Sequence, residues 1–183
     1  RRAAERLEAM DLPGQVAWLG LGLVAVLWVI LDQLLGLGQA SELPPWPGAA
    51  LMADPVTAVP LNAASSLMVA LSVMLCGRMF GRRPTLTEAL IAVLWLQFLL
   101  LGAMAVSMAV GLVLPAAGAL FGLVALVGYL WLLVRFTSVL TRIDSLMATA
   151  VSLIVAGLIV SLAFGLVLSL LIATGLVSIP GVA

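Results

Sequence analysis

The sequence predicts an all-α membrane protein, a bundle of five transmembrane helices. Of its 183 residues, 64% are hydrophobic and only 9% are charged, whereas a soluble domain has about 25% charged and 45–50% apolar residues. The apolar residues gather in five runs, each long enough to cross the ~30 Å hydrocarbon core of a bilayer as a helix. The expected spans are residues 15–37, 61–80, 87–113, 116–137 and 146–173, and residues 15–183 form a single transmembrane domain.

Residues 1–14 precede the first span, and their pattern of apolar and charged residues predicts a short amphipathic helix on the cytoplasmic membrane surface. Ala3, Leu7 and Met10 recur at helical spacing with charged residues between them, a pattern typical of interfacial helices. A Pro-Gly pair at 13–14 ends the helix. Two interpretations stay open for this segment: a solvated helical leader without a partner, and an anchor whose arginines bind anionic lipid headgroups.

Residues 38–60 form the long connection between the first two spans. They hold five prolines. Because each proline removes a backbone donor and fixes φ, we expect no long helix here.

The distribution of arginine predicts the orientation. All eight cations are arginines, and they lie in residues 1–13, 77–88 and 135–145. With a cytoplasmic N-terminus, five spans place all three segments on the cytoplasmic side. The 38–60 connection, the turn at Pro115 and the C-terminal tail hold no arginine. The positive-inside rule therefore predicts the N-terminus inside and the C-terminus outside.

The charged turn of residues 77–88 separates the second and third spans. Thr85 and Glu88 have the Thr-x-x-Glu spacing of a capping box and follow Pro84, so the third helix should begin at about Thr85. The basic turns are also the candidate contact sites for a lipid headgroup or a cytoplasmic partner, although topology alone can explain their charge. The candidate contact residues are Arg78, Arg82, Arg83, Arg135 and Arg142. Near Arg135, Tyr129 and Trp131 fit an aromatic belt at the membrane surface.

Three polar side chains within the spans are candidates for an intramembrane polar site: Asp32, Asn62 and Gln97. Gln97 ranks first, because a mid-membrane amide must find a protein partner where lipid offers none. Asn62 shares a helix face with Ser66 and can bond a neighbouring helix. Asp32 lies near a span end, where interfacial water is within reach, so we prefer a structural role to a proton, ion or partner contact.

Small residues at four-residue steps predict close helix packing. Gly118 and Gly122 form a Gly-x-x-x-Gly pair in the fourth span. The longest row, in the fifth span, is Gly157, Ser161, Gly165 and Ser169. We favour a partner for this row within the same chain, and a second copy stays open.

The composition excludes several chemistries. The chain has no His, which excludes a Ser-His-Asp triad, His-containing zinc sites and haem ligation by His. The single Cys76 cannot hold a cluster and is expected to be a buried, inert thiol. The Gly pairs lack the Lys of a phosphate-binding loop. We therefore expect no catalytic residue, no metal, no cofactor and no nucleic-acid partner.

The sequence resembles one known family. The stretch GRMFGRRPTLTEAL of residues 77–90, which runs into LWLQ at 94–97, is similar to the turn between the second and third spans of bacterial Yip-domain proteins. The AMDLP stretch of residues 9–13 and the five-span layout are similar too. The family is named for Ypt/Rab-interacting proteins of eukaryotic secretory membranes. The resemblance implies a compact integral protein of a bacterial inner membrane without known catalytic residues.

The function expected from these observations is a non-enzymatic membrane scaffold. Its partners would be membrane lipids, a second copy of the chain or another membrane protein. The alternative is a small transporter, a channel or an accessory subunit of a membrane complex, with Asn62, Gln97 and Asp32 along its path. An intramembrane enzyme is a third hypothesis, which lacks the paired acids or activated nucleophile that it would need.

Overall fold

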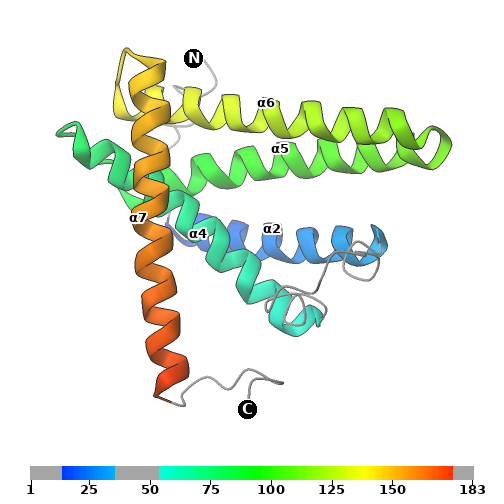
Figure 1. Ribbon diagram of the computed structural model, residues 1–183, viewed down its shortest axis with the longest axis horizontal. Coiled ribbons are helices and arrows are strands. Elements are labelled where there is room, and N and C mark those ends of the chain that lie inside the picture. The colour runs from blue at the N-terminus through cyan, green and yellow to red at the C-terminus, as the bar shows by residue number, and fades with distance from the viewer. Residues whose placement is uncertain (1–13, 36–53, 175–183) are drawn as a thin grey trace.

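The computed structural model describes residues 14–35 and 54–174 (Figure 1). Within these ranges the chain forms five α-helices and no strand. The helices are α2 (Gly14–Leu35), α4 (Pro55–Met79), α5 (Leu86–Val113), α6 (Pro115–Thr141) and α7 (Leu146–Ala173). All five are long and apolar enough to cross a membrane, so the predicted fold class is confirmed and the chain is a multi-pass membrane protein. The amphipathic helix predicted for residues 1–14 falls almost wholly outside the described residues.

The helices carry apolar side chains on their outer as well as their inner faces. Leu158 and Leu162 of α7, for example, are 60% and 74% exposed. Such exposure would be costly in water but is expected in lipid, where acyl chains cover the outer face. Helices suit this solvent because their backbone donors and acceptors are satisfied within the segment.

α4 begins six residues earlier than predicted, so residues 55–60, which were assigned to the connection, belong to the helix. The Asp54 side chain caps the helix by accepting from the Val56 amide at 3.4 Å. Pro55 occupies the first helical turn, where a backbone N–H would have no intrahelical acceptor, so the helix loses no hydrogen bond. Pro60 lies inside the helix and removes only one backbone hydrogen bond. At the other end of the molecule, α6 continues to Thr141, four residues past its predicted end.

The ends of α4 and α6 and the beginnings of α5 and α7 lie at one end of the molecule, and α2 begins beside the beginning of α5 (Figure 1). A Cβ built on Gly14 would lie 4.0 Å from Thr87 Oγ1, and one built on Gly77 would lie 3.1 Å from Thr141 Cγ2. Because Arg78, Arg82, Arg83 and Arg142 lie at or beside these ends, we call this part of the molecule the basic end.

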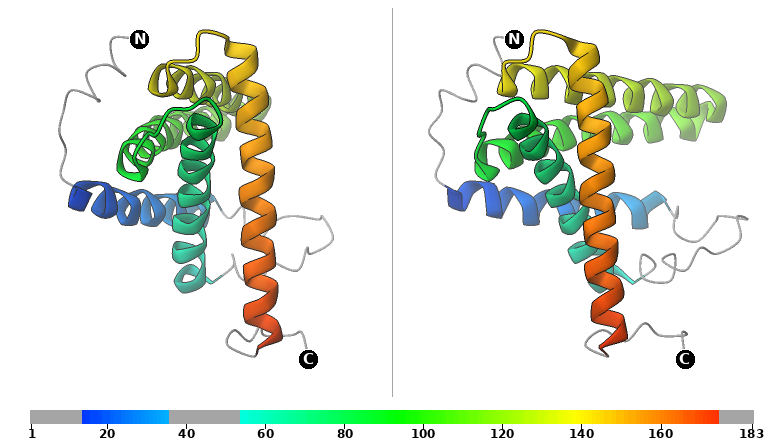
Figure 2. Two further views of the ribbon diagram at one scale, coloured as in Figure 1. Left: turned by 90° about the vertical axis from the view of Figure 1, so that its left-hand side faces the viewer. Right: turned by 60° about the vertical axis from the view of Figure 1, so that its left-hand side comes forward.

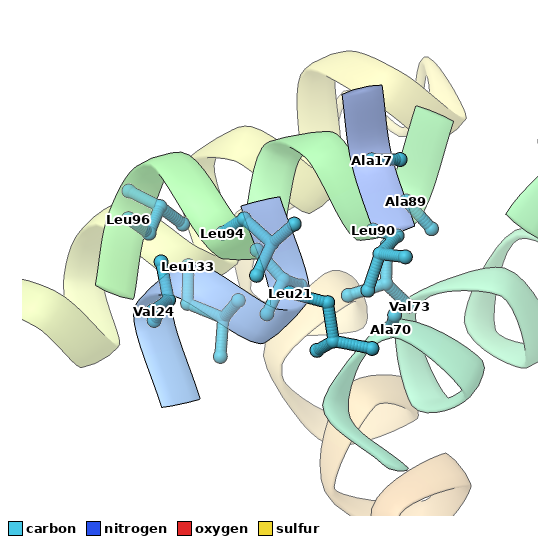
Figure 3. Packing of buried hydrophobic residues seen from close by; sticks show 11 residues of the cluster. Ala17, Leu21, Val24, Ala70, Val73, Ala89, Leu90, Leu94, Leu96 and Leu133 are labelled. Atoms are coloured by element: carbon cyan, nitrogen blue, oxygen red, sulfur yellow. The ribbon is translucent and has the colours of Figure 1, made fainter. Parts of the chain in front are cut away.

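The helices diverge from the basic end and do not share one axis. α2 and the antiparallel α5–α6 hairpin extend in one direction, while α4 and α7 extend in another (Figures 1 and 2). The apolar core lies among α2, α4 and α5, with Leu133 added from α6 (Figure 3). Its other members are Ala17, Leu21, Val24, Ala70, Val73, Ala89, Leu90, Val93, Leu94 and Leu96. Of the five described helices, α6 and α7 are the least buried.

Candidate functional site

The turn after α4 is fixed by a pair of backbone hydrogen bonds. Gly81 adopts the left-handed conformation, with φ at 74°. Its amide donates to the Arg78 carbonyl at 3.1 Å, and the Arg82 amide donates to the Gly77 carbonyl at 3.0 Å. These bonds form a Schellman motif, which satisfies carbonyls left free at the end of the helix. Glycine suits this position because it takes positive φ without steric cost.

Hydrogen bonds at the beginning of α5 fix the other end of the same turn. Thr85 Oγ1 accepts from the Glu88 amide at 3.2 Å, and Glu88 Oε2 accepts from the Thr85 amide at 2.9 Å. The predicted capping box is therefore confirmed. Pro84 is buried, and a Cβ built on Gly77 would lie only 2.7 Å from its ring. The turn thus folds back onto α4, and only glycine allows this close approach.

Arg78, Gly81, Arg82 and Arg83 line a surface pocket of about 490 Å³. The three arginines are exposed, and none of them forms an ion pair with a described residue. The nearest acid along the chain, Glu88, already accepts from the Thr85 amide. Guanidinium groups bind phosphate and carboxylate oxygens through paired N–H donors. This pocket, which we call the arginine pocket, therefore has the chemistry of an anion site.

The other two predicted arginines lie outside the arginine pocket. Arg142 takes the left-handed position of the turn after α6, with φ at 53°. Its amide donates to the Val139 carbonyl at 3.2 Å, and the Ile143 amide donates to the Ser138 carbonyl at 3.0 Å. This is a second Schellman motif, with an arginine where glycine is favoured. The guanidinium of Arg135 lies 5.3 Å from the ring centre of Trp131, a cation–π contact.

A buried polar contact joins α4 to α5 through Gln97, and Tyr129 of α6 lies beside it. Ser66 of α4 donates to Gln97 Oε1 at 2.9 Å, and the Tyr129 side chain is near enough to interact with the Gln97 amide. Gln97 is only 9% exposed. The Asn62 side chain donates to the Ala58 carbonyl of its own helix at 3.2 Å. The structure thus brings Gln97 together with Ser66 and Tyr129, while Asn62 adjoins them only through its carbonyl, which accepts from Ser66.

The third predicted polar residue, Asp32, is not part of this network. Its side chain is half-buried in the last turn of α2 and forms no hydrogen bond or ion pair with a described residue. The three residues predicted as one polar site therefore do not gather into one.

Sequence reasoning missed Tyr129, which it assigned to an aromatic belt. A usable signal was the symmetry of the α5–α6 hairpin. Gln97 lies 17 residues before Leu114 and Tyr129 lies 15 residues after it. Residues at similar distances from a tight antiparallel turn face each other, so the two side chains could have been paired from their positions alone.

A second buried polar contact joins α4 to α7. Cys76 Sγ lies 3.0 Å from Ser152 Oγ, and the Ser152 hydroxyl also bonds the Thr149 carbonyl at 3.0 Å. Cys76 is fully buried, which confirms the prediction of a buried thiol. Sequence reasoning did not predict its hydroxyl partner.

The predicted small-residue contact of α6 is confirmed within the chain. A Cβ built on Gly118 would lie 2.5 Å from Gly111 Cα, and one built on Gly122 would lie 3.0 Å from Ser107 Oγ. Ser107 Oγ also donates to the Gly118 carbonyl at 2.7 Å. The absence of side chains at these glycines lets α5 and α6 approach closely enough for this bond.

The row on α7 finds an internal partner only at its first member. A Cβ built on Gly157 would lie 3.9 Å from Ser72 Oγ of α4. Ser161, Gly165 and Ser169 are exposed, so the expectation of an internal partner is wrong for these three. The described part of α4 diverges from α7 and does not cover them (Figures 1 and 2).

Comparison with known proteins found no matching family model, no matching curated protein and no matching solved structure. The resemblance to Yip-domain proteins therefore stays a prediction that rests on the residues quoted for it.

Proposed function

We propose that this protein is a non-enzymatic scaffold of a bacterial inner membrane, of the Yip-domain type, which binds lipids, a second copy of itself or another membrane protein. The observation that carries the proposal is the hydrogen bonding of Gln97. The residue ranked first for an intramembrane polar site accepts a hydrogen bond from Ser66 of the neighbouring helix and is almost fully buried. An amide bonded across two helices stabilises helix packing, as polar groups in membranes commonly do.

The transporter alternative places different demands on the same residues. A transport path needs polar side chains that face water or the substrate. Asn62 instead bonds its own helix, and Gln97 bonds Ser66 of the neighbouring helix. This arrangement favours the scaffold over a polar path through the bundle.

The outer face of α7 supports an interaction role. Ser161, Gly165 and Ser169 form a row of small exposed residues, and a Cβ built on Gly165 would meet nothing within 4 Å. Rows of small residues let the backbone of a second helix approach closely in lipid. We propose this row as the surface through which the scaffold contacts another transmembrane helix.

We also propose that the basic end faces the cytoplasm, with the N-terminus inside and the C-terminus outside. The support is that Arg78, Arg82, Arg83 and Arg142 lie in or beside the two turns that follow α4 and α6, at one end of the molecule. Arginine-rich turns are retained on the cytoplasmic side.

Purification of the tagged chain from its native membrane in a mild detergent, followed by mass spectrometry and size measurement, tests the scaffold. We expect a homo-oligomer or a stoichiometric membrane partner. Gly165→Leu should dissociate it by blocking the close approach, whereas Gly102→Leu should not, because Gly102 is also exposed with open space around it but lies outside the row. A monomer without a partner would contradict the proposal. Solute uptake that Gln97→Leu abolishes, with the fold intact, would establish the transporter instead.

A further inference from the structure

We propose that the arginine pocket binds the phosphate group of an anionic phospholipid. This inference deepens the scaffold function proposed above and rests on it, since it names the lipid class and the residues that hold it. The pocket lies between the end of α4 and the beginning of α5, and its charged lining is Arg78, Arg82 and Arg83.

The charge of the pocket is suited to a phosphate. Three exposed arginines line one hollow, and none of them has a carboxylate partner among the described residues. The C-terminal end of a helix normally repels anions through its free carbonyls. Here the carbonyls of Gly77 and Arg78 accept from the amides of Arg82 and Gly81, which reduces that repulsion.

The backbone of the pocket is organised before any ligand arrives. The Schellman motif fixes Gly81 and Arg82, and the capping box fixes the residues that follow. Pro84 packs against Gly77 beneath the turn. A binding site whose backbone is already ordered has a smaller entropic cost of binding. The volume, about 490 Å³, also lies within the ~300–1,000 Å³ range of small-ligand sites.

Two apolar neighbours favour a lipid over free phosphate. Met79 and Phe80 are 52% and 46% exposed. They lie in the chain between Arg78 and Gly81, both of which line the pocket. A ligand that uses both surfaces has a phosphate group and a hydrocarbon part. In the proposed orientation, this turn also lies at the membrane surface, where anionic headgroups are most concentrated.

The test is native mass spectrometry of the full chain in a mild detergent. The probes are phosphatidylglycerol and phosphatidylcholine with the same acyl chains, and the competitors are inorganic phosphate and glycerol 3-phosphate. The test variant is the double substitution Arg82→Gln with Arg83→Gln. Arg142→Gln is the matched control, because Arg142 is exposed at the same end of the molecule but lies outside the pocket.

We expect tighter binding of phosphatidylglycerol than of phosphatidylcholine. The double variant should weaken phosphatidylglycerol binding roughly tenfold or more, as the loss of two interfacial arginines implies. The control should leave it nearly unchanged. Equal affinity for the two lipids, or full binding by the double variant, would overturn the proposal. Competition by inorganic phosphate or glycerol 3-phosphate at concentrations similar to the lipid would overturn the choice of lipid and assign the pocket to free phosphate.

Thermal unfolding without added lipid shows whether each variant is folded. If the double variant is unfolded, Arg82→Lys with Arg83→Lys replaces it, which keeps the charge and removes the guanidinium fork. This variant should bind phosphatidylglycerol more weakly than the unaltered chain, and undiminished binding would contradict guanidinium recognition. If the chain is a monomer but still binds phosphatidylglycerol through the arginines, the helix-contact role of α7 is refuted and the lipid site is retained. The failure of the scaffold proposal can therefore be told apart from the failure of the lipid-site proposal.

Discussion

Gln97 is the residue whose environment could be predicted only in part. That a mid-span amide needs a protein partner follows from the sequence, because lipid supplies no hydrogen bond. The identity of the partners depends on how α4 and α6 are rotated against α5, which hydropathy does not specify. The structure supplies Ser66 as the hydrogen-bond donor and places Tyr129 beside the same amide.

Two adjacent serines test the contribution of this network. Ser66→Ala removes the contacts to Gln97 and to the Asn62 carbonyl, while Ser65→Ala removes only a bond to that same carbonyl. We expect Ser66→Ala to lower the free energy of unfolding by ~0.6 kcal/mol, with ~1.7 kcal/mol as the upper end for such bonds in membranes. Ser65→Ala should have almost no effect. Unfolding in mixed micelles with increasing SDS measures both.

A double-mutant cycle isolates the bond itself. Combining Ser66→Ala with Gln97→Leu should cost less than the sum of the two single changes, because both remove the same contact. Strict additivity would show that the hydrogen bond contributes nothing to stability.

The left-handed positions of the two Schellman motifs give a second pair of expectations. Arg142 has the same left-handed backbone conformation as Gly81, although it carries a side chain. Arg142→Gly should therefore raise the free energy of unfolding, and Gly81→Ala should lower it, each by about 1 kcal/mol. The cost at Gly81 is a backbone cost alone, since an added Cβ meets nothing within 4 Å. Thermal unfolding in detergent measures both changes, and a destabilised Arg142→Gly would mean that the arginine side chain contributes more than its backbone strain costs.

At the scale of elements, most of the α5–α6 hairpin could be predicted from the sequence. A short turn at Pro115 joins two long apolar runs, and the Gly-x-x-x-Gly pair indicates where they approach. The same rule misled on α7, where the row continues beyond the reach of α4. A row of small residues specifies that close packing is feasible, but the partner depends on how neighbouring helices diverge in space.

Two glycines of α6 test the hairpin contact. A Cβ on Gly118 would lie 2.5 Å from Gly111 Cα, a backbone atom that cannot move without separating the helices. We expect Gly118→Ala to lower the free energy of unfolding by roughly 1–3 kcal/mol through overpacking. Gly128→Ala should be neutral or slightly stabilising, because a Cβ there meets nothing within 4 Å and alanine favours helix. Thermal unfolding of the two variants in one detergent makes the comparison, and equal stabilities would contradict the close contact.

At the scale of the whole molecule, the number and approximate bounds of the spans follow from the sequence because lipid imposes them. A helix must be apolar over its full crossing length, and an apolar run of that length can be recognised in the sequence alone. The divergence of the helices from the basic end is not visible in this way. It depends on a core concentrated among α2, α4 and α5, while α6 packs along α5 and α7 packs against α4.

The convergence of the arginine-bearing ends makes a prediction about sidedness. Asp144 lies in the exposed turn between α6 and α7 at the basic end, and Ala116 lies exposed beside the turn between α5 and α6. If the basic end is cytoplasmic, a membrane-impermeant maleimide should label Ala116→Cys in intact spheroplasts. It should label Asp144→Cys only after lysis, since charged reagents do not cross the hydrocarbon core. The native Cys76 is fully buried and provides the background control. Labelling of Asp144→Cys from outside would reverse the orientation and would place the arginine pocket away from the cytoplasmic leaflet.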